Sequence, residues 1–239
     1  MSALLTLSAE TRAAIREEAI RRLTELRAQN RIADYFPATG PVRRELYPKH
    51  LEFFRLGAEI QERGFMAANR VGKTIVGAYE MTCHLTGEYP EWWEGRRFAE
   101  PVDCWAAGDT AETTRDIVQF ELFGPVGALG TGMIPYRYIV GTPSSRRGVA
   151  DSYDTAEIRH KSGGVSRIGL KSYDQGRRKF QGTKKDVIWC DEEPPADVYD
   201  ECMIRLMTRT GIMMVTFTPL NGLSEIALRF MPGLAPDAS

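Results

Sequence analysis

The sequence predicts an α/β fold in three layers, with a mainly parallel central sheet and helices on both faces. Three observations lead to this prediction. Short apolar segments alternate with helical patterns, a turn containing Gly-Lys-Thr joins one apolar segment to a helix, and a later apolar segment ends in a run of acids. Strands that alternate with helices run side by side in the same direction, so a parallel sheet is expected. A helical extension is expected before this domain.

The composition is typical of a globular protein. Its 239 residues are 43% hydrophobic, which is enough for a sizeable core. Lys and Arg total 31 against 32 acidic residues, so the net charge of -1 creates no overall attraction to nucleic acid. The 4 cysteines form no CxxC pair, which favours a reducing compartment. No apolar run approaches the roughly 20 residues of a membrane span, so we expect an intracellular protein without membrane contact.

A surface helix is expected over residues 9–30, with Ser8 as its N-cap. One stripe of this helix is apolar among many Arg and Glu residues. The stripe consists of Ile15, Ala19, Leu23 and Leu26. Pro and Gly residues then interrupt the pattern, and helical spacing resumes in ELYPKHLEFFRLGAEI, residues 45–60. We therefore assign residues 1–40 to a helical extension and residues 41–231 to the main domain.

The main domain begins with two strand–turn–helix units. GFMAA, residues 64–68, is a short apolar run that predicts a buried strand, and a helical pattern over 73–86 follows it. The same order repeats with a strand over 102–107 and a helix over 110–123, which Thr110 caps. Two units in the same order support the parallel sheet.

The middle of the chain is less regular. Residues 124–150 are rich in Gly, Pro and Arg and are expected to form a loop. TAEIRH, residues 155–160, and VSRIGLKS, residues 165–172, flank a turn at Ser162–Gly164. These two segments predict a β-hairpin.

Two further strands and two helices complete the domain. The strands are expected at DVIWC, residues 186–190, and GIMMVTFT, residues 211–218. The helices are expected over 197–208 and 223–230. The last residues, 232–239, are small or are Pro and Gly, and we expect them to begin a linker to a further domain.

FMAANRVGKT, residues 65–74, holds most of a phosphate-binding loop, whose pattern is G-x-x-x-x-G-K-[ST]. Gly72, Lys73 and Thr74 fill the last three places, but Ala67 stands where the first Gly belongs. Ala is the smallest replacement where the backbone needs no positive φ. In such a loop, backbone N–H groups wrap the phosphates, the Lys reaches the terminal phosphates and the Thr hydroxyl holds Mg²⁺. A chance Gly-Lys-Thr at an ordinary strand-to-helix turn is the alternative.

Every residue of this loop is a candidate nucleotide contact. The residues are Ala67, Ala68, Asn69, Arg70, Val71, Gly72, Lys73 and Thr74. Lys73 and Arg70 are also candidate catalytic residues, because the Lys ammonium reaches the terminal phosphates and an Arg in the loop points at phosphate or at acidic partners. An ordinary surface arginine is the alternative for Arg70.

DVIWCDEE, residues 186–193, has the Walker B pattern of an apolar strand followed by acids. Asp191 and Glu192 lie just past the carboxyl end of the strand, where open α/β sheets bind ligands. Asp191 is predicted to hold Mg²⁺ through water, and Glu192 to be the base that orients the attacking water. Glu193 is expected to be a solvated or structural acid, and an ordinary turn or helix cap is the alternative for the whole cluster. Paired with the Gly-Lys-Thr loop upstream, these acids predict a working site for ATP and Mg²⁺.

The sequence resembles the large terminase subunit of tailed bacteriophages, the ATPase that drives double-stranded DNA into the procapsid. Three segments carry the resemblance in the family's order: AANRVGKT, VIWCDEEPP, and TFTPLNG at residues 216–222, which looks like the family's coupling motif. YPKHLEFF lies where the family has its adenine-binding segment, usually built around a Gln, although His50 stands near that place here. The resemblance spans about residues 40–230.

This resemblance implies a P-loop NTPase domain of the ASCE, RecA-like type that hydrolyses ATP with Mg²⁺. Carried over to this sequence, it places Lys73 and Thr74 on phosphate, Thr74 and Asp191 on Mg²⁺, and Glu192 as the base. These are the roles that the residue patterns predict independently.

The resemblance also implies roles that the patterns alone do not give. It implies that Thr216 and Thr218 relay hydrolysis to movement, although Thr is common in strands without any function. It places Tyr47 and His50 at the adenine, with a packed or surface histidine as the alternative for His50.

The partners that the resemblance implies are double-stranded DNA, the portal protein of the procapsid and the terminase small subunit. It further implies a homo-oligomeric ring when assembled, while an isolated ATPase half is expected to be monomeric. The implied location is the host cell cytoplasm, and transiently the portal vertex of the procapsid. The family's C-terminal nuclease domain has no room in this sequence, so nuclease activity is not expected of it.

Basic residues supply two further candidates. Ring-forming motors of this kind usually complete the site with an arginine from the adjacent subunit. The candidates in the Gly- and Pro-rich stretch are Arg137, Arg146 and Arg147. A second group could touch phosphate backbones or form a solvated face. It consists of Arg177, Arg178, Lys179, Lys184 and Lys185.

Three other classes of protein stay open at this point. A helicase-like nucleic-acid translocase shares the strand order and a Walker B of Asp-Glu type, but its second motor domain does not fit in this length. A nucleotide-dependent scaffold binds ATP without turnover; the absent first Gly favours it and Glu192 argues against it. A small-molecule kinase would normally carry a lid and no segment like TFTPLNG.

Overall fold

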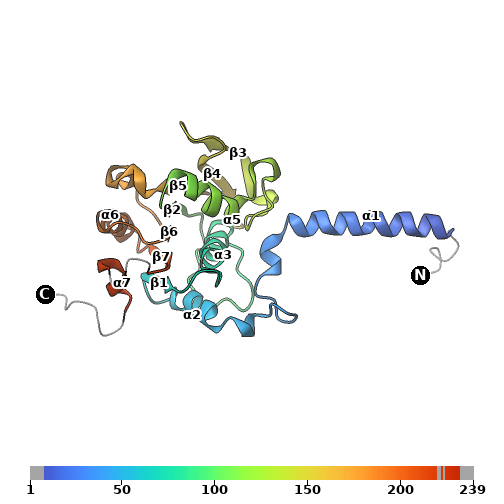
Figure 1. Cartoon of the computed structure of the whole chain (residues 1–239), viewed down its shortest axis with the longest axis horizontal. Helices are drawn as coiled ribbons and strands as arrows, with labels where there is room; N and C mark the ends of the chain where they lie inside the picture. The colour runs from blue at the N-terminus through green and yellow to red at the C-terminus, as the bar shows by residue number, and fades with distance from the viewer. Residues whose placement is uncertain (1–7, 220–221, 223, 232–239) are drawn as a thin grey trace.

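The computed structural model describes residues 8–219, 222 and 224–231. At its centre is a seven-stranded sheet with the order β1-β7-β6-β2-β5-β4-β3 (Figure 1). The strands are β1 Glu62–Met66, β2 Asp103–Gly108, β3 Ile139–Ser145, β4 Tyr153–Arg159, β5 Val165–Ser172, β6 Val187–Asp191 and β7 Ile212–Phe217. The run from β1 to β5 is parallel, whereas β4 is antiparallel to both of its neighbours.

Helices lie on both faces of this sheet, which confirms the predicted fold class (Figure 1). The α-helices are α1 Ala9–Ala28, α2 Pro48–Leu56, α3 Lys73–Thr86, α4 Ala111–Thr113, α5 Phe120–Phe123, α6 Ala196–Met207 and α7 Glu225–Arg229. Helices α2, α3 and α5 contribute to the core on one face, and α6 and α7 to the core on the other. Helices α4 and α5 are joined by a π-helical segment, Thr114–Gln119, that the sequence did not predict.

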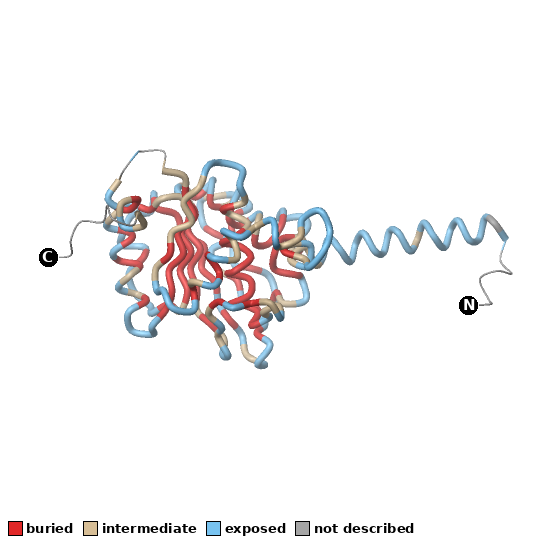
Figure 2. The backbone as a smooth tube through the Cα atoms, turned by 90° about the horizontal axis from the view of Figure 1, so that it is seen from below, coloured by how far each residue is buried: buried red, intermediate tan, exposed pale blue. Residues whose placement is uncertain are grey.

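Side chains alternate between the two faces along each central strand. In β6, Val187 and Trp189 belong to the α3 side of the core, whereas Ile188 and Cys190 belong to the α6 side. All four are fully buried. The central strands are correspondingly red in Figure 2. A parallel strand that is covered on both faces has a continuous run of apolar residues, and for this reason DVIWC predicts a buried strand. Burying a large side chain contributes roughly 1.5–3 kcal/mol, so packing on both faces holds the end of β6 in place.

Helix α3 lies against β6 at a distance that only glycine allows. A Cβ atom added to Gly77 would come within 2.1 Å of the indole of Trp189. The helix begins after Gly72 and ends before Gly87, both with positive φ, and these bounds match the predicted helix. Close packing on β6 therefore fixes where the amino end of α3 lies relative to the acids that follow β6.

A buried charged network anchors α3 to β1. The guanidinium group of Arg63 donates to the carboxylate of Glu80 at 2.7 Å, and Nε2 of His84 lies 3.1 Å from the same carboxylate. Burial alone would raise the pKa of Glu80, but Arg63 and His84 outweigh it and hold that pKa below its ordinary value. Burial lowers the pKa of His84, so its imidazole is neutral at neutral pH. Since all three side chains are buried, breaking the network would leave an uncompensated charge in the core.

Helix α1 projects away from the body of the molecule (Figure 1). Its N-cap is Ser8, as predicted, which accepts a hydrogen bond from the backbone N–H of Thr11 at 3.2 Å. Almost the whole projecting helix is coloured as exposed in Figure 2. The predicted apolar stripe is exposed with it, and Leu26 is 62% accessible to solvent. Ion pairs one turn apart, such as Arg22 with Glu18 at 2.7 Å, contribute to the helix. Within the described residues, no helix combines the length and apolar character that crossing a bilayer requires.

Two expectations about the elements were wrong in part. Residues 124–150 are not all loop, because Ile139–Ser145 forms β3 and pairs with β4 at the edge of the sheet. An edge strand tolerates Pro143 and carries few apolar residues, so its pattern resembles a loop. A helix was expected over 45–60, but a short 3₁₀ turn, Arg44–Leu46, comes first. Helix α2 then begins only at Pro48 and ends at Leu56.

Some predictions fall outside the described residues. They concern the expected linker at 232–239 and the positions 220, 221 and 223 between β7 and α7. The boundary between the extension and the main domain stays a prediction.

Candidate functional site

The Gly-Lys-Thr loop and the acids after β6 meet at the carboxyl edge of the sheet. The Thr74 hydroxyl lies 3.2 Å from each carboxylate oxygen of Asp191 and donates to it, although 117 positions separate the two residues. Thr74 lies in the first turn of α3, and Asp191 is the last residue of β6. The two segments predicted to share a nucleotide are therefore in direct contact.

Strand β7 lies between β1 and β6, so the strand that leads into the loop and the strand that ends in the acids are not direct neighbours. Thr216 of β7 fills this intermediate position. Its hydroxyl donates to Asp191 Oδ1 at 2.8 Å and accepts from the Trp189 indole N–H at 2.8 Å. The carboxylate of Asp191 is therefore held by hydroxyl groups from α3 and from β7. The sequence did not predict any part for Trp189.

The carboxylate of Asp191 is buried, with the residue only 4% exposed. Burial raises its pKa to about 7, and the charge of Glu192 acts in the same direction. Hydrogen bonds from Thr216 and Thr74 and the charge of Lys73 oppose this rise without cancelling it. A cation placed beside Asp191 would offset the cost of its negative charge, which is a property expected of a metal ligand.

The residues at this position fit Mg²⁺ bound together with phosphate. Mg²⁺ takes oxygen ligands and is usually held by one or two carboxylates, waters and substrate phosphates. Thr74 and Asp191 offer one hydroxyl and one carboxylate side by side. Among the residues that the structure describes, no three His, Cys, Asp or Glu side chains form a cage for a metal ion. The arrangement fits a metal that arrives with its nucleotide.

The loop before α3 forms a cradle of backbone donors. Arg70 and Gly72 have φ values of 66° and 87°, which turn the chain sharply ahead of the helix. No acceptor among the described residues is bonded to the backbone N–H groups of residues 69–72. Successive free N–H groups at a helix amino end are the usual anion site of α/β proteins. Lys73 reaches across this cradle, and its ammonium group donates to the Ala68 carbonyl at 3.0 Å.

Ala67 explains how the loop does without its first glycine. Its N–H donates to the Phe217 carbonyl at 3.2 Å, which continues the ladder between β1 and β7. Ala67 is not among the residues with positive φ. Because the backbone needs no left-handed conformation there, a Cβ atom costs nothing, and the absent glycine gives no reason to expect a decayed loop.

Glu192 and Thr218 lie at the mouth of the same site. Glu192 has a φ of 66°, and its carboxylate accepts from the backbone N–H of Thr218 at 3.4 Å. The Thr218 hydroxyl lies 3.1 Å from the Ala67 carbonyl and 2.9 Å from Asn69 Oδ1. Thr218 therefore touches both the loop and Glu192, which is the position that a relay between them requires. The roles of these residues stay predictions.

Tyr173 belongs to this site, but the sequence did not predict it. Its hydroxyl donates to the Glu192 carbonyl at 3.0 Å and lies 3.2 Å from the Asp191 carbonyl. It therefore braces the turn that carries both acids. Tyr173 directly follows β5, so its place at the carboxyl edge of the sheet was the available signal.

A cavity of about 670 Å³ lies beside the loop on the side of α2. It is lined by Asp34, Tyr35, Phe36, Val42, Tyr47, His50, Arg70, Val71, Gly72 and Ile75. The predicted adenine residues Tyr47 and His50 are both present. Nε2 of His50 lies 3.1 Å from the Val71 carbonyl, and since burial lowers the pKa of His50, the neutral ring donates through this nitrogen. The residues before position 47 were not predicted, because they lie at or near the region assigned to the extension.

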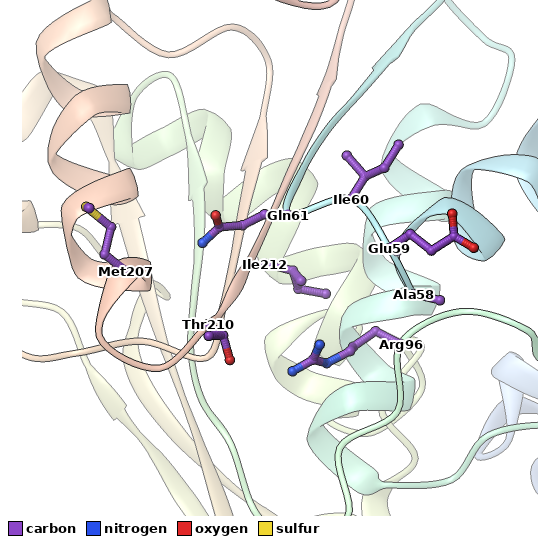
Figure 3. A pocket seen from close by; sticks show the side chains of 9 residues that line it. Ala58, Glu59, Ile60, Gln61, Arg96, Met207, Thr210 and Ile212 are labelled. Atoms are coloured by element: carbon purple, nitrogen blue, oxygen red, sulfur yellow. The ribbon is translucent and has the colours of Figure 1, made fainter.

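A second cavity, of about 360 Å³, lies at the opposite edge of the sheet (Figure 3). Gln61 and Ile212 at its wall stand at the amino ends of β1 and β7. Arg96 also lines this cavity. The phosphate loop and both acids lie at the carboxyl ends of the parallel strands, away from it. This cavity is therefore separate from the candidate nucleotide site.

The three candidate arginines differ in accessibility. Arg146 is only 8% exposed, and its guanidinium group donates to the Leu170 carbonyl and to the Ser172 hydroxyl of β5. A buried guanidinium group held in this way cannot reach the nucleotide site of an adjacent subunit, so Arg146 does not suit the role of the arginine that completes that site. Arg137 is exposed and donates to Asn30 at 3.0 Å, and Arg147 is exposed.

The basic group between β5 and β6 is not a uniform solvated face. Lys185 is buried and pairs with Asp103 at 2.6 Å, so it belongs to the structure of the sheet. Arg177 pairs with Glu201 of α6 at 2.9 Å. The exposed members without such a described ion pair are Arg178, Lys179 and Lys184.

The sequence of this chain is similar to that of a known protein family. Residues 64–235 match the family described as terminase large subunit, T4likevirus-type, N-terminal. The chain is also 35% identical over 205 residues to the terminase large subunit of Salmonella phage P22. This match covers 77% of the chain and 41% of the phage P22 protein, so the chain spans less than half the length of that relative.

Two solved structures of the large terminase from a thermophilic bacteriophage are also similar. One is a complex with ADP, with a TM-score of 0.48, and the other has a TM-score of 0.49. Each is 17% identical and covers 72% of this chain and 37% of the other. The family match includes the loop at 67–74, the acids at 191–192 and the strand that carries Thr216. The chain belongs to the terminase large subunit family of the T4likevirus type, within its N-terminal region.

Proposed function

We propose that this domain is the ATP-hydrolysing motor of a viral DNA-packaging terminase. In this proposal it couples cleavage of the β–γ phosphoanhydride bond of ATP to translocation of double-stranded DNA into the procapsid. The observation that carries the proposal is the contact between Thr74 and Asp191 at the amino end of α3. Membership of the terminase large subunit family supports the packaging role.

Binding of the triphosphate would use the cradle before α3. The free N–H groups of residues 69–72 would donate to phosphate oxygens, and the positive end of the α3 dipole favours the same anion. The ammonium group of Lys73 would exchange the Ala68 carbonyl for the terminal phosphates. Arg70, exposed on the loop, would add a second cation near the phosphates.

Thr74 and Asp191 would hold Mg²⁺, Thr74 directly and Asp191 through water. The bound ion would neutralise charge that develops on the phosphate oxygens. The fixed orientation of the Asp191 carboxylate, held by Thr74 and Thr216, would place its oxygen atoms without a search among rotamers. This preorganisation lowers the entropic cost of binding.

Glu192 would orient the attacking water and accept its proton. Its carboxylate lies at the mouth of the site and reaches the N–H of Thr218. After hydrolysis, a change in this contact would be felt by Thr218, which also touches Ala67 and Asn69 of the loop. Thr216 and Thr218 are therefore proposed to pass the nucleotide state to the strand β7.

The adenine would occupy the cavity between the loop and α2. Tyr47 offers an aromatic face there, and His50 is fixed by its bond to the Val71 carbonyl. Phe36 lines the same cavity and packs at right angles to Tyr47 with ring centroids 5.8 Å apart. Apolar and aromatic walls with a few polar groups are typical of small-molecule sites.

The proposed partners are double-stranded DNA, the portal protein of the procapsid and the terminase small subunit. The proposed assembly is a homo-oligomeric ring in which Arg137 or Arg147 of one copy completes the site of the next. The exposed Arg178, Lys179 and Lys184 are candidates for contact with the DNA backbone. The proposed location is the host cell cytoplasm and, during packaging, the portal vertex.

The test is the variant Glu192→Gln, which keeps the size of the side chain and removes its basicity. ATP hydrolysis should fall by roughly 10²–10⁴-fold, the usual contribution of a general base, while ATP binding measured by calorimetry is retained. Retained turnover would remove Glu192 from its proposed role. ATP binding without turnover in the wild-type protein would instead favour the nucleotide-dependent scaffold. Stimulation of the ATPase by portal complexes with linear duplex DNA separates a packaging motor from a helicase-like translocase.

A further inference from the structure

Two consecutive acids after β6 contact opposite ends of one segment of the chain. Glu192 accepts from the backbone N–H of Thr218 at 3.4 Å. Glu193 accepts from the hydroxyl of Ser224. The turn after β6 therefore holds the chain where it leaves β7 and again where it enters α7. The proposed catalytic turn is thus attached at two points to the connection between β7 and α7.

The contact at Ser224 involves the amino end of α7. Ser224 is the N-cap of this helix, and its oxygen accepts from the backbone N–H of Ala227 at 3.0 Å. With its proton donated to Glu193, the Ser224 hydroxyl is both donor and acceptor, and its orientation is fixed. Glu193 is half-buried and not the solvated acid that the sequence allowed.

Helix α7 is a packed element. Ile226 and Ala227 are buried in the core on the α6 side. The ring of Phe230 lies over Gly64 of β1, so closely that an added Cβ atom would come within 2.5 Å of it. The same ring lies 6.2 Å from that of Phe217 at the end of β7. A displacement of α7 would therefore disturb the packing of β1 and β7. Strand β1 leads into the loop, and β7 carries Thr216 and leads into Thr218.

The backbone at the turn has an unfavourable conformation at Glu192. Glu192 has a φ of 66°, in the left-handed region that is unfavourable for residues other than Gly. Unfavourable conformations of this kind are found at sites that switch between two arrangements. Because Glu192 and Glu193 are adjacent, a change in the backbone dihedral angles at Glu192 would move the carboxylates of both residues.

We propose that Glu193 is a positioning residue that couples the turn after β6 to α7 through its hydrogen bond with Ser224, so that α7 responds to the nucleotide state. This rests on the proposed function, because it needs a nucleotide that Glu192 senses. It differs from the threonine relay along β7, since it reaches α7 directly from the acids. Glu193 makes no contact with the phosphate loop among the described hydrogen bonds, and it is not a catalytic residue.

The experiment measures amide hydrogen exchange of α7 in the ATP-bound and ADP-bound states. A non-hydrolysable ATP analogue with Mg²⁺ gives the ATP-bound state with Glu192 intact, and Mg²⁺ with ADP gives the product state. In the protein with Glu193 intact, exchange in residues 225–230 should differ about fivefold or more between the two states, the lower end of usual coupling energies. A structural role alone predicts the same exchange in both states.

Three variants separate coupling from folding. Glu193→Ala removes the acceptor, and Ser224→Gly removes the donor while keeping a residue that is tolerated at an N-cap. Both should abolish the difference between the nucleotide states, and they should leave binding of the ATP analogue unchanged. Glu193→Gln keeps an acceptor oxygen and should restore the difference. Glu225→Ala, which removes a carboxylate of the same helix end that pairs with Arg229, is the matched control and should keep it.

The outcomes distinguish this inference from the function on which it rests. If the wild-type protein fails to bind nucleotide, the proposed function falls and the coupling with it. If nucleotide binds and is hydrolysed but α7 exchanges equally in both states, the coupling alone is overturned. It is likewise overturned if Glu193→Ala keeps the difference. Should Glu193→Ala fail to fold, Ser224→Gly decides the question.

Discussion

The hydroxyl of Thr216 lies 2.8 Å from the carboxylate of Asp191, and it is the point at which β7 touches the candidate magnesium ligand. Thr216 is fully buried and also accepts from the indole of Trp189. One hydroxyl thus links β7 to β6, the strand that ends in the acids. Four variants test how the features around this contact work.

Replacement of Thr216 by Val, which has the same shape, should destabilise the protein. It removes the bond to Asp191 and leaves the Trp189 N–H without an acceptor in the core. An unsatisfied buried group of this kind costs about 1–3 kcal/mol, measured as a loss in the free energy of unfolding by urea. Thr216→Ser keeps the hydroxyl and is the control. Equal stability of the Val and Ser variants would show that the hydroxyl contributes nothing.

Replacement of Asp191 by Asn should stabilise the nucleotide-free protein at alkaline pH. The folded-state pKa of Asp191 is raised to about 7, against about 3.9 for an unfolded aspartate. The folded state therefore holds the proton more tightly, and the wild-type protein loses stability as pH rises from about 4 to 7. Above pH 7 the loss is complete and amounts to at most about 4 kcal/mol, which Asn avoids.

The measurement compares melting temperatures of wild type and Asp191→Asn from pH 4 to pH 8 without metal. The advantage of Asn should be largest at pH 8 and absent near pH 4. The two proteins must be compared at the same pH, because the histidines add a pH dependence of their own. Burial lowers the pKa of His50, His84 and His160, so the folded protein loses stability as pH falls below about 6.5. This effect is opposite in sign to that of Asp191 and is common to both proteins. An advantage that persists at pH 4 would contradict the assignment to Asp191.

Restoring the first glycine of the phosphate loop should not improve nucleotide binding. The backbone of Ala67 has no positive φ, so Ala67→Gly relieves no strain. Gly in this position should instead lower stability by roughly 0.5–1 kcal/mol through its freedom in the unfolded chain. Calorimetric titration with ATP should give affinities within about twofold of each other, since no contact is gained. A large gain in affinity would show that Ala67 impairs the loop.

Introduction of a side chain at Gly77 should separate α3 from β6. Gly77→Ala places its Cβ atom against the Trp189 indole and should cost about 1–3 kcal/mol, as other overpacked cores do. Because α3 carries Lys73 and Thr74, nucleotide affinity should fall as well. Gly127→Ala is the matched control, since nothing lies within 4 Å of its Cβ position and its φ is not positive. Thermal melting of both variants gives the comparison.

The parts of the fold that local pattern determines were predictable from the sequence. Helix α3 has glycines at both ends, and β6 is apolar because both of its faces are covered, so each element is recognisable from its own residues. The same holds for the loop and the acids, whose residue types are those that the proposed binding of phosphate and metal would require. The contact between Thr74 and Asp191 then follows from the order of strands and helices in a parallel sheet.

The parts that depend on contacts between distant segments were not predictable. Tyr173 reaches the acids only because β5 joins the same sheet, and its place after a strand becomes informative only once the order of the strands is known. Phe36 lines the cavity beside α2, although it lies in the segment assigned to the extension. Edge strand β3 was missed because a strand with one exposed side and a proline has almost no apolar alternation.

The projecting helix α1 has a consequence for how the molecule unfolds. At 20 residues and 1.5 Å per residue it is about 30 Å long, and its side chains are almost entirely in contact with water. A solitary helix of this length is held mainly by its own hydrogen bonds, so it frays and reforms without waiting for the sheet to melt. Its amide protons will therefore exchange orders of magnitude sooner than those of β6, and a protease will find its first cleavage site there while the candidate nucleotide site is still intact.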